Sequence, residues 1–165
     1  MYNPRIFFIS IFVICLALLF FALYLEHFQE LEACPLCVFQ RIAYILIVLI
    51  TLIGAIHNPK NLFLVIYKSL IIIIAITGAL IAGRQIWLQH LPPELVPECG
   101  PGLDYMLNVF PFSEAIKMIL AGSGECAEVK WRFISLSIAE WSLIMFVGIT
   151  IATTLSIYIY KKIKL

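Results

Sequence analysis

Four apolar runs constrain the fold of this chain more than any other feature. They cover residues 6–25, 38–56, 62–82 and 141–160, and each is 19 to 21 residues long. At about 1.5 Å of rise per residue, a helix of that length spans roughly 30 Å, the thickness of a bilayer core. The chain has 63% hydrophobic and only 13% charged residues, a composition that excludes a water-soluble domain. The sequence predicts an all-α membrane protein, a four-helix transmembrane bundle forming one domain over residues 1–165.

Two loops are expected on one side of the bundle, at about residues 26–37 and 83–140. The second loop is long and rich in proline and glycine, which argues against a large regular domain there. It is expected to carry one short amphipathic helix, with Ser113 as N-cap and Glu114 in the first turn. The apolar side of that helix would consist of Ile116, Ile119 and Leu120.

Charged residues predict the orientation of the bundle. Arg5, Lys60 and the lysines of residues 161–164 share one face, which should be cytoplasmic together with both termini. Every acidic residue belongs to the segments of the opposite face. The first run is too long for a signal peptide, so we expect an uncleaved anchor in the lipid bilayer. Lys68 is expected to extend toward the cytoplasmic interface. The net charge of +1 argues neither for nor against nucleic acid, and we expect no nucleic-acid partner.

Four of the five cysteines fall in the outer loops. Cys15 lies inside the first run and is interpreted as a packing residue. Cys34, Cys37, Cys99 and Cys126 form an even set on the outer face, where disulfides are expected. One alternative is a pair of structural disulfides, although the short Cys34–Cys37 loop would stabilise a fold little. A zinc site is a weaker alternative, because only one C-x-x-C is present, and no metal is expected.

Polar residues near Cys37 favour redox chemistry over a structural role. Arg41 follows one helical turn after Cys37, so its guanidinium would favour the thiolate and stabilise charge developing on an acceptor's oxygen. A contact between Arg41 and lipid headgroups is the alternative. Gln40 is a second candidate contact, and His90 a candidate for a hydrogen bond or proton transfer, with an interfacial histidine as its alternative.

The two groups of cysteines suit a relay of thiol–disulfide exchange. Cys99 lies in a Pro- and Gly-rich loop that suits an encounter with a soluble thiol. Cys126 follows Gly-Ser-Gly-Glu, a stretch expected to be flexible enough to bring it to Cys34. Cys37 is closest to the second apolar run and is placed to face an apolar electron acceptor.

At these residues the chain resembles the DsbB family, the quinone-dependent thiol oxidases of the Gram-negative inner membrane. The resemblance is carried by Cys-Pro-Leu-Cys-Val-Phe-Gln-Arg at 34–41, Pro-Glu-Cys-Gly-Pro at 97–101 and Ser-Gly-Glu-Cys-Ala-Glu at 123–128, followed by Trp131. Gly83 and Gln85, leading to His90, also resemble the third helix of the family. Order, spacing and the four spans agree over essentially the whole chain.

The resemblance implies redox-active disulfides Cys34–Cys37 and Cys99–Cys126 in periplasmic loops. A reduced periplasmic oxidase of the DsbA type would attack the second disulfide and form a mixed disulfide with Cys99. Cys126 would then attack Cys34, releasing Cys37 as a thiolate that engages ubiquinone or menaquinone in a charge-transfer complex, with Arg41 as the quinone contact. The quinone is required because such a partner has a potential of about −120 mV. An oxidase for a dedicated partner, of the DsbI type, and a non-catalytic membrane subunit with structural disulfides are the alternative functions.

Overall fold

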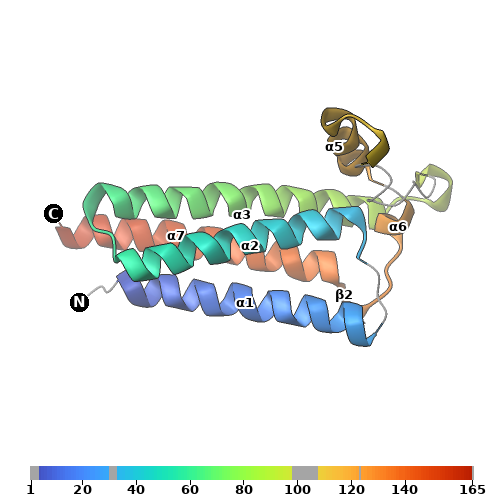
Figure 1. Cartoon of the computed structure of the whole chain (residues 1–165). Coiled ribbons are helices and arrows are strands. Elements are labelled where there is room, and N and C mark those ends of the chain that lie inside the picture. Colours follow the sequence, from blue (N-terminus) through green and yellow to red (C-terminus); the bar gives the residue numbers. More distant parts are fainter. Residues whose placement is uncertain (1–3, 30–32, 98–107, 123, 165) are drawn as a thin grey trace.

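Four long helices form the body of the molecule. The computed structural model describes residues 4–29, 33–97, 108–122 and 124–164. The helices are α1 (Pro4–Phe28), α2 (Pro35–His57), α3 (Asn61–Gln89) and α7 (Ile138–Lys164), and they lie side by side (Figure 1). All four are long and apolar enough to cross a membrane, with mean hydropathies between 2.0 and 3.1 over their most apolar stretches. The predicted four-helix membrane bundle is confirmed.

The centre of the bundle is packed with large apolar side chains. Helix α3 packs against both α2 and α7, and α1 packs against α2. Phe8, Ile47, Ile71 and Phe146 are completely buried between them. The outer surfaces of the same helices expose many large aliphatic side chains, an arrangement that suits lipid around the bundle rather than water.

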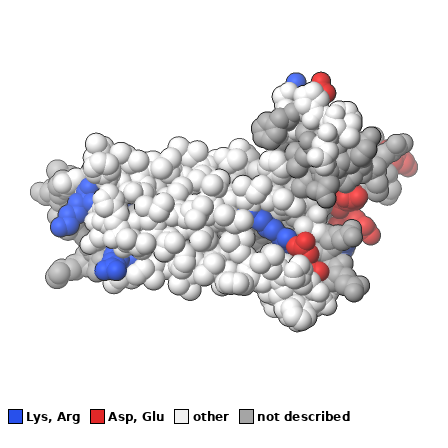
Figure 2. All heavy atoms as spheres, viewed as in Figure 1, with Lys and Arg blue, Asp and Glu red and all other residues white. Residues whose placement is uncertain are grey.

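Charge is distributed unequally between the two ends of the bundle. Helix α1 begins and α7 ends at the same end, shown on the left of Figure 1. On the visible face, the atoms at that end include lysine and arginine, whereas aspartate and glutamate gather at the opposite end (Figure 2). The opposite end also holds helix α6 and the start of α2, so the described cysteines of the outer loops lie at the acidic end.

All four long helices extend into segments that the sequence assigned to loops. Helix α3 continues through Gln89, so residues 83–89 are helical rather than part of the second loop. They contain no proline, and the first helix breakers are Pro92 and Pro93. Helix α2 begins at Pro35, which places Cys37 in its first turn.

The second loop contains several short elements. These are the 3₁₀ helix η1 (Pro93–Leu95), helices α5 (Phe112–Ala121) and α6 (Gly124–Ala127), and strands β1 (Arg132–Phe133) and β2 (Leu136–Ser137). The strands form an antiparallel hairpin in which Arg132 pairs with Ser137 and Phe133 with Leu136. The connecting residues Ile134 and Ser135 both have positive φ, 51° and 65°, as a type I′ turn requires.

Helix α5 is the predicted amphipathic helix, but it begins earlier than expected. Pro111 precedes its first residue, and no side-chain hydrogen bond caps it, so the prediction of Ser113 as N-cap is wrong. The proline ring already fixes a φ of −54° that suits entry into a helix, and Ser113 falls inside the first turn with Glu114. Ile119 is buried and Ile116 half-buried, whereas the side chain of Leu120 lies outside the described part.

Lys68 does not extend to the interface as the sequence suggested. Its side chain is completely buried, and its Nζ donates a hydrogen bond to Ser156 Oγ on α7 at 2.6 Å. The same nitrogen lies 4.9 Å from the centre of the Phe7 ring, a cation–π contact. An acceptor and an aromatic face inside the bundle therefore replace the water that Lys68 was expected to reach.

Candidate functional site

The C-x-x-C pair lies at the N-terminus of α2. Cys34 is the N-cap residue, and Pro35 begins the helix, a position that suits proline because the first helical N–H has no partner in the helix. The backbone N–H of Cys37 donates to Cys34 Sγ at 3.4 Å, and the two sulfur atoms are 2.9 Å apart. A helix N-terminus favours negative charge, so the local fold already supports a thiolate here.

Cys126 lies against this pair. It belongs to α6, is completely buried, and packs in one cluster with Cys34, Leu36, Leu88 and Ile119. Residues 124–127 form a helical turn, and Cys126 lies with Cys34 in that apolar cluster. Hydrogen bonding with Cys126 and with Cys37, together with burial, raises the pKa of the Cys34 thiol above its usual range. Cys99 lies outside the described residues.

Gln85 of α3 contacts both sulfur atoms of the pair. Its Nε2 lies 3.2 Å from Cys37 Sγ and 3.4 Å from Cys34 Sγ. Its Oε1 accepts a hydrogen bond from Gln40 Nε2 at 2.7 Å. Both glutamines are only 3% exposed, so they form a buried amide pair that joins α2 to α3 beside the cysteines.

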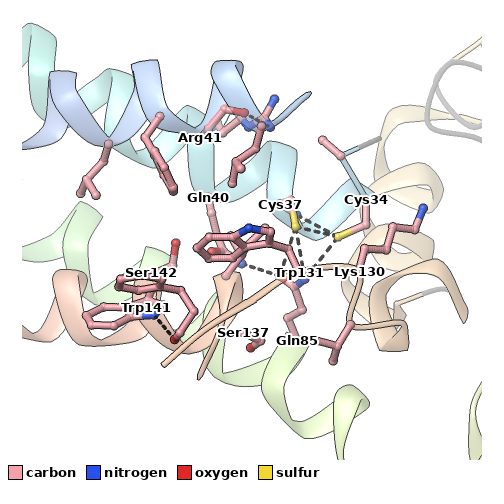
Figure 3. A pocket seen from close by; sticks show the side chains of 18 of the residues that line it. Cys34, Cys37, Gln40, Arg41, Gln85, Lys130, Trp131, Ser137, Trp141 and Ser142 are labelled. Atoms are coloured by element: carbon pink, nitrogen blue, oxygen red, sulfur yellow. Dashed lines mark hydrogen bonds between the residues drawn. The ribbon is translucent and has the colours of Figure 1, made fainter. Parts of the chain in front are cut away.

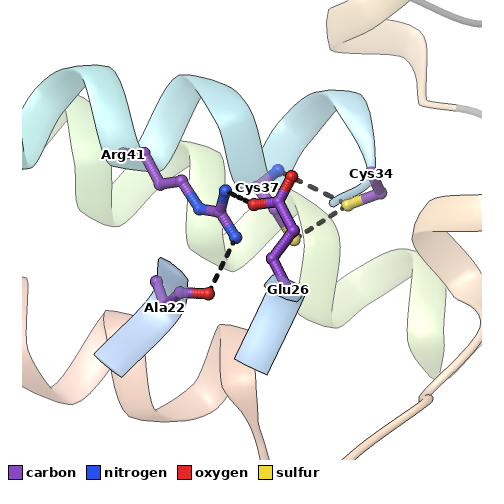
Figure 4. Close-up of polar contacts among 5 residues, drawn as sticks. All are labelled: Ala22, Glu26, Cys34, Cys37 and Arg41. Carbon is purple, nitrogen blue, oxygen red and sulfur yellow. Dashed lines mark hydrogen bonds and ion pairs between the residues drawn. The ribbon is translucent and has the colours of Figure 1, made fainter. Parts of the chain in front are cut away.

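Arg41 is held by helix α1. One of its guanidinium nitrogens forms an ion pair with the Glu26 carboxylate, and another donates to the carbonyl oxygen of Ala22 at 3.3 Å (Figure 4). The side chains of Arg41 and Glu26 are 22% and 33% exposed. Arg41 thus lies on the same helix as Cys37, as the i+4 spacing requires, and its charge is shared with an acidic partner.

A cavity of about 630 Å³ opens beside Cys37. Figure 3 shows its polar side chains and two tryptophans converging on the same space. Its walls are largely apolar and come from α1, α2, α7 and the β1–β2 hairpin, including Leu18, Leu25, Trp131, Phe133, Trp141 and Met145. Polar groups gather at one part of the lining, where Cys34, Cys37, Gln40, Arg41 and Gln85 all contribute. This combination suits a largely apolar molecule with a polar head.

The hairpin holds the aromatic part of that wall in place. The Trp141 indole N–H donates to the carbonyl oxygen of Phe133 at 3.1 Å. Trp131 stacks on Phe133 with ring centres 6.0 Å apart, and its other neighbour is Phe21 of α1 at 5.8 Å. The hairpin therefore closes the cavity between α1 and α7.

His90 is a predicted cofactor contact that the structure does not bring to this cavity. It follows the last residue of α3, and its exposed ring nitrogen Nδ1 lies 2.9 Å from the carbonyl oxygen of Ile86. The residues lining the cavity include Gln85 and Gln89 from the same helix but not His90. Any contact of His90 with a molecule in the cavity would need its ring to leave the Ile86 carbonyl.

Reasoning from the sequence missed four contributors to the site. Gln85 was noted only as part of a resemblance, yet its spacing of five residues from His90 puts it on a different side of α3. Glu26 was recognised as an outer acidic residue and not as the partner of Arg41. Trp131 and Trp141 were not identified as site residues, because nothing in the sequence alone indicated the hairpin that turns them toward the cysteines.

Comparisons with known proteins agree with this geometry. Residues 4–156 match the family described as disulfide bond formation protein DsbB. The chain is 50% identical over 148 residues to disulfide bond formation protein B of Hahella chejuensis, covering 90% of this chain and 89% of that protein. It is 48% identical over 146 residues to disulfide bond formation protein B 1 of Pseudomonas aeruginosa, covering 88% and 90%. The cysteine pair, the membrane bundle and these similarities agree, and the chain belongs to the DsbB family.

Proposed function

We propose that this protein is a membrane thiol–disulfide oxidoreductase that reoxidises a soluble periplasmic dithiol oxidase similar to DsbA and passes the electrons to membrane quinone. One observation carries the proposal: Cys37 and Arg41 line the same apolar cavity, while the neighbouring Cys34 packs against Cys126. Cys34 also contributes to the cavity lining, so the pair as a whole lies between a space for an apolar acceptor and a third cysteine.

The proposed electron path runs from the partner to Cys99, then through Cys126 and Cys34 to Cys37. The partner's thiolate opens the Cys99–Cys126 disulfide and bonds to Cys99. Cys126 then attacks Cys34 of the Cys34–Cys37 disulfide, and Cys37 leaves as a thiolate. The packing of Cys126 against Cys34 supports this step, because the attacking and attacked sulfurs belong to one buried cluster.

The residues around the cavity fit a quinone, ubiquinone or menaquinone. Its apolar walls would bind the ring and the isoprenoid chain, and Arg41 and Gln40 would hold the ring oxygens at the polar part of the lining. When bound, a quinone supplies the capacity to accept two electrons and two protons, which matches the oxidation of two thiols to one disulfide. Arg41 and the helix N-terminus would favour the negative charge on Cys37.

We place the protein in the bacterial inner membrane with both termini in the cytoplasm. The positive charges at the end where α1 begins and α7 ends support this orientation. The acidic end, with Cys34, Cys37 and Cys126, would then face the periplasm, where disulfides persist and where a DsbA-like partner is found.

The proposal is tested with the purified full-length protein, a short-chain ubiquinone or menaquinone, and a reduced DsbA-like protein. Quinone absorbance should fall with time in the wild type, and Cys37→Ser should abolish the change. Cys15→Ala, which alters a buried cysteine of α1 that does not line the cavity, should retain activity.

Three results would contradict parts of the proposal. Quinone reduction by Cys37→Ser would show that electrons leave from another residue. If the wild-type protein reduced neither ubiquinone nor menaquinone with any reduced partner, and unfolded once its disulfides were reduced, the result would indicate a structural subunit. Activity with one particular thiol protein and not with DsbA-like proteins would indicate an oxidase for a dedicated partner.

A further inference from the structure

We propose that Gln85 is a further catalytic residue, whose side-chain amide stabilises the Cys37 thiolate, and that Gln40 is a positioning residue that sets the orientation of this amide. The inference rests on the proposed function, in which Cys37 is released as a thiolate. In this inference, the side chain that donates a hydrogen bond directly to the reacting sulfur comes from α3 and is not Arg41.

The amide of Gln85 is placed to serve both cysteines. Its Nε2 carries two N–H groups and lies within hydrogen-bonding distance of both sulfurs, closer to Cys37 (3.2 Å) than to Cys34 (3.4 Å). The Cys37 sulfur also lies 3.6 Å from Gln85 Oε1. A protonated Cys37 can therefore donate to the oxygen, whereas the thiolate accepts from the nearer nitrogen.

Gln40 determines which end of the Gln85 amide faces the sulfurs. Its Nε2 donates to Gln85 Oε1 at 2.7 Å, which leaves Nε2 of Gln85 directed at the cysteines. Both side chains are 3% exposed, so water competes little for either group. The reversed amide would present oxygen lone pairs to the thiolate and would destabilise it.

Arg41 acts on the same sulfur less directly. Its guanidinium is engaged by Glu26 and by the carbonyl of Ala22, whereas among the described residues Gln85 is the side chain whose N–H groups reach Cys37 Sγ. A hydrogen bond to a charged group inside a protein is stronger than one between neutral groups. We therefore expect Gln85 to set much of the thiolate population of Cys37.

Several charged or titratable groups surround Cys37, and all of them stay in place when Gln85 alone is changed. They are Cys34, Arg41 and Tyr44 of α2, Glu26 of α1, Glu125 and Cys126 of α6, and Glu128 and Lys130 before the hairpin. A difference between the wild type and a Gln85 variant therefore reports the amide itself.

The test is the pH dependence of iodoacetamide alkylation at Cys37 in the fully reduced, full-length protein without quinone, followed by site-resolved mass spectrometry. Gln85→Leu should move the alkylation midpoint of Cys37 upward by about one to two pH units, the loss expected for a hydrogen bond to a charged group. Gln40→Met removes the N–H that holds Gln85 Oε1 without adding a charge, so the Gln85 amide is no longer fixed and the midpoint should shift in the same direction by a smaller amount.

Thr77→Val is the control on α3, since it removes an exposed hydroxyl that bonds the Ile73 carbonyl of its own helix and lies outside the cavity lining. Its alkylation midpoint should equal that of the wild type. An unchanged midpoint in both Gln85→Leu and Gln40→Met, with thermal melts like those of the wild type, would overturn the inference. Because this assay contains neither quinone nor partner, its outcome is independent of whether the wild type reduces quinone.

Discussion

The Arg41 guanidinium is paired with the Glu26 carboxylate, which comes from the neighbouring helix α1. The pair lies beside the cavity that Cys37 also lines. It holds a long, rotamer-rich side chain in one place, so less entropy is lost when a ligand binds to it. A second donation from Arg41 to the Ala22 carbonyl fixes the plane of the guanidinium.

Replacing Arg41 tests its proposed role as the quinone contact. Arg41→Met removes the cation and keeps an unbranched side chain. We expect the KM for quinone to rise by about 10- to 100-fold, because a charge-assisted hydrogen bond to the ring oxygen is lost. Steady-state quinone reduction at saturating partner concentration gives the KM. An unchanged KM would return Arg41 to the lipid-headgroup interpretation.

Two further variants test whether the KM for quinone also depends on the orientation of Arg41 or on His90. Glu26→Gln keeps an oxygen acceptor for Arg41, so its effect on the KM should be several-fold smaller than that of Arg41→Met. His90→Ala should also have the smaller effect, since the His90 ring is bonded to the Ile86 carbonyl outside the cavity. If His90→Ala raised the KM as much as Arg41→Met, the quinone site would have to extend beyond Gln89, where the lining of the cavity from α3 ends.

The raised pKa of Cys34 predicts a pH dependence of the reduced protein. An ordinary cysteine ionises near pH 8.5, but hydrogen bonding with Cys126 and Cys37, together with burial, keeps Cys34 protonated above that pH. Iodoacetamide should therefore modify Cys34 much more slowly at pH 9 than it modifies an unfolded peptide with the same cysteine. Rapid labelling of Cys34 at pH 9 in the folded protein would contradict the raised pKa.

The same shift has a consequence for stability. The folded state holds the Cys34 proton more tightly than the unfolded state does, so this contribution is fully present below about pH 8.5 and is lost as the pH rises toward the folded pKa. Thermal melts of the reduced protein should therefore decline more steeply between pH 8 and pH 10 than melts of Cys34→Ala. If the melting temperatures of the two proteins fell equally over this range, Cys34 would not be the source of the pH dependence of stability.

The sequence predicted the parts of the site that lie within one or two helical turns. Cys37 and Arg41 share a helix, and fixed spacing places both on the cavity side of α2 whatever the rest of the chain does. The four helices followed in the same way from the length of the apolar runs. The prediction of the Cys37–Arg41 pair depends on local helix geometry, and the prediction of the four helices depends on the thickness of the bilayer. Neither prediction requires knowledge of how the helices pack.

Contacts between helices could not be derived from the sequence. Gln85 reaches Cys37 across 48 positions of sequence, and Glu26 reaches Arg41 across 15. The hairpin was missed because Ile134 and Ser135 carry none of the usual Asn-Gly signal of a type I′ turn. Lys68 was misplaced for a related reason, since Ser156 and Phe7 become its neighbours only when three helices pack together.

Gly78 should be required for the packing of α3 against α7. A Cβ atom at this position would lie 2.5 Å from the Phe146 ring, and that ring is fully buried and stacked on Tyr44 with centres 4.3 Å apart. We expect Gly78→Ala to destabilise the bundle by about 1–3 kcal/mol through overpacking. Gly83→Ala on the same helix is the control, because a Cβ there meets no atom within 4 Å. Thermal melts in detergent should separate the two variants, and equal melts would show that Phe146 can move aside.

The buried contact between Lys68 and Ser156 should couple α3 to α7. Lys68 Nζ donates to Ser156 Oγ at 2.6 Å, and both side chains are buried. Hydrogen bonds between helices in a membrane protein contribute about 0.6 kcal/mol on average and up to about 1.7 kcal/mol. A double-mutant cycle with Lys68→Met and Ser156→Ala, measured by unfolding in mixed micelles, should give a coupling toward the upper end of this range, because the donor is charged. Thr154→Ala provides the control on α7, since the Thr154 hydroxyl is exposed and bonds within its own helix. Strictly additive effects of the two variants would show that Lys68 is held by its other neighbours and not by Ser156.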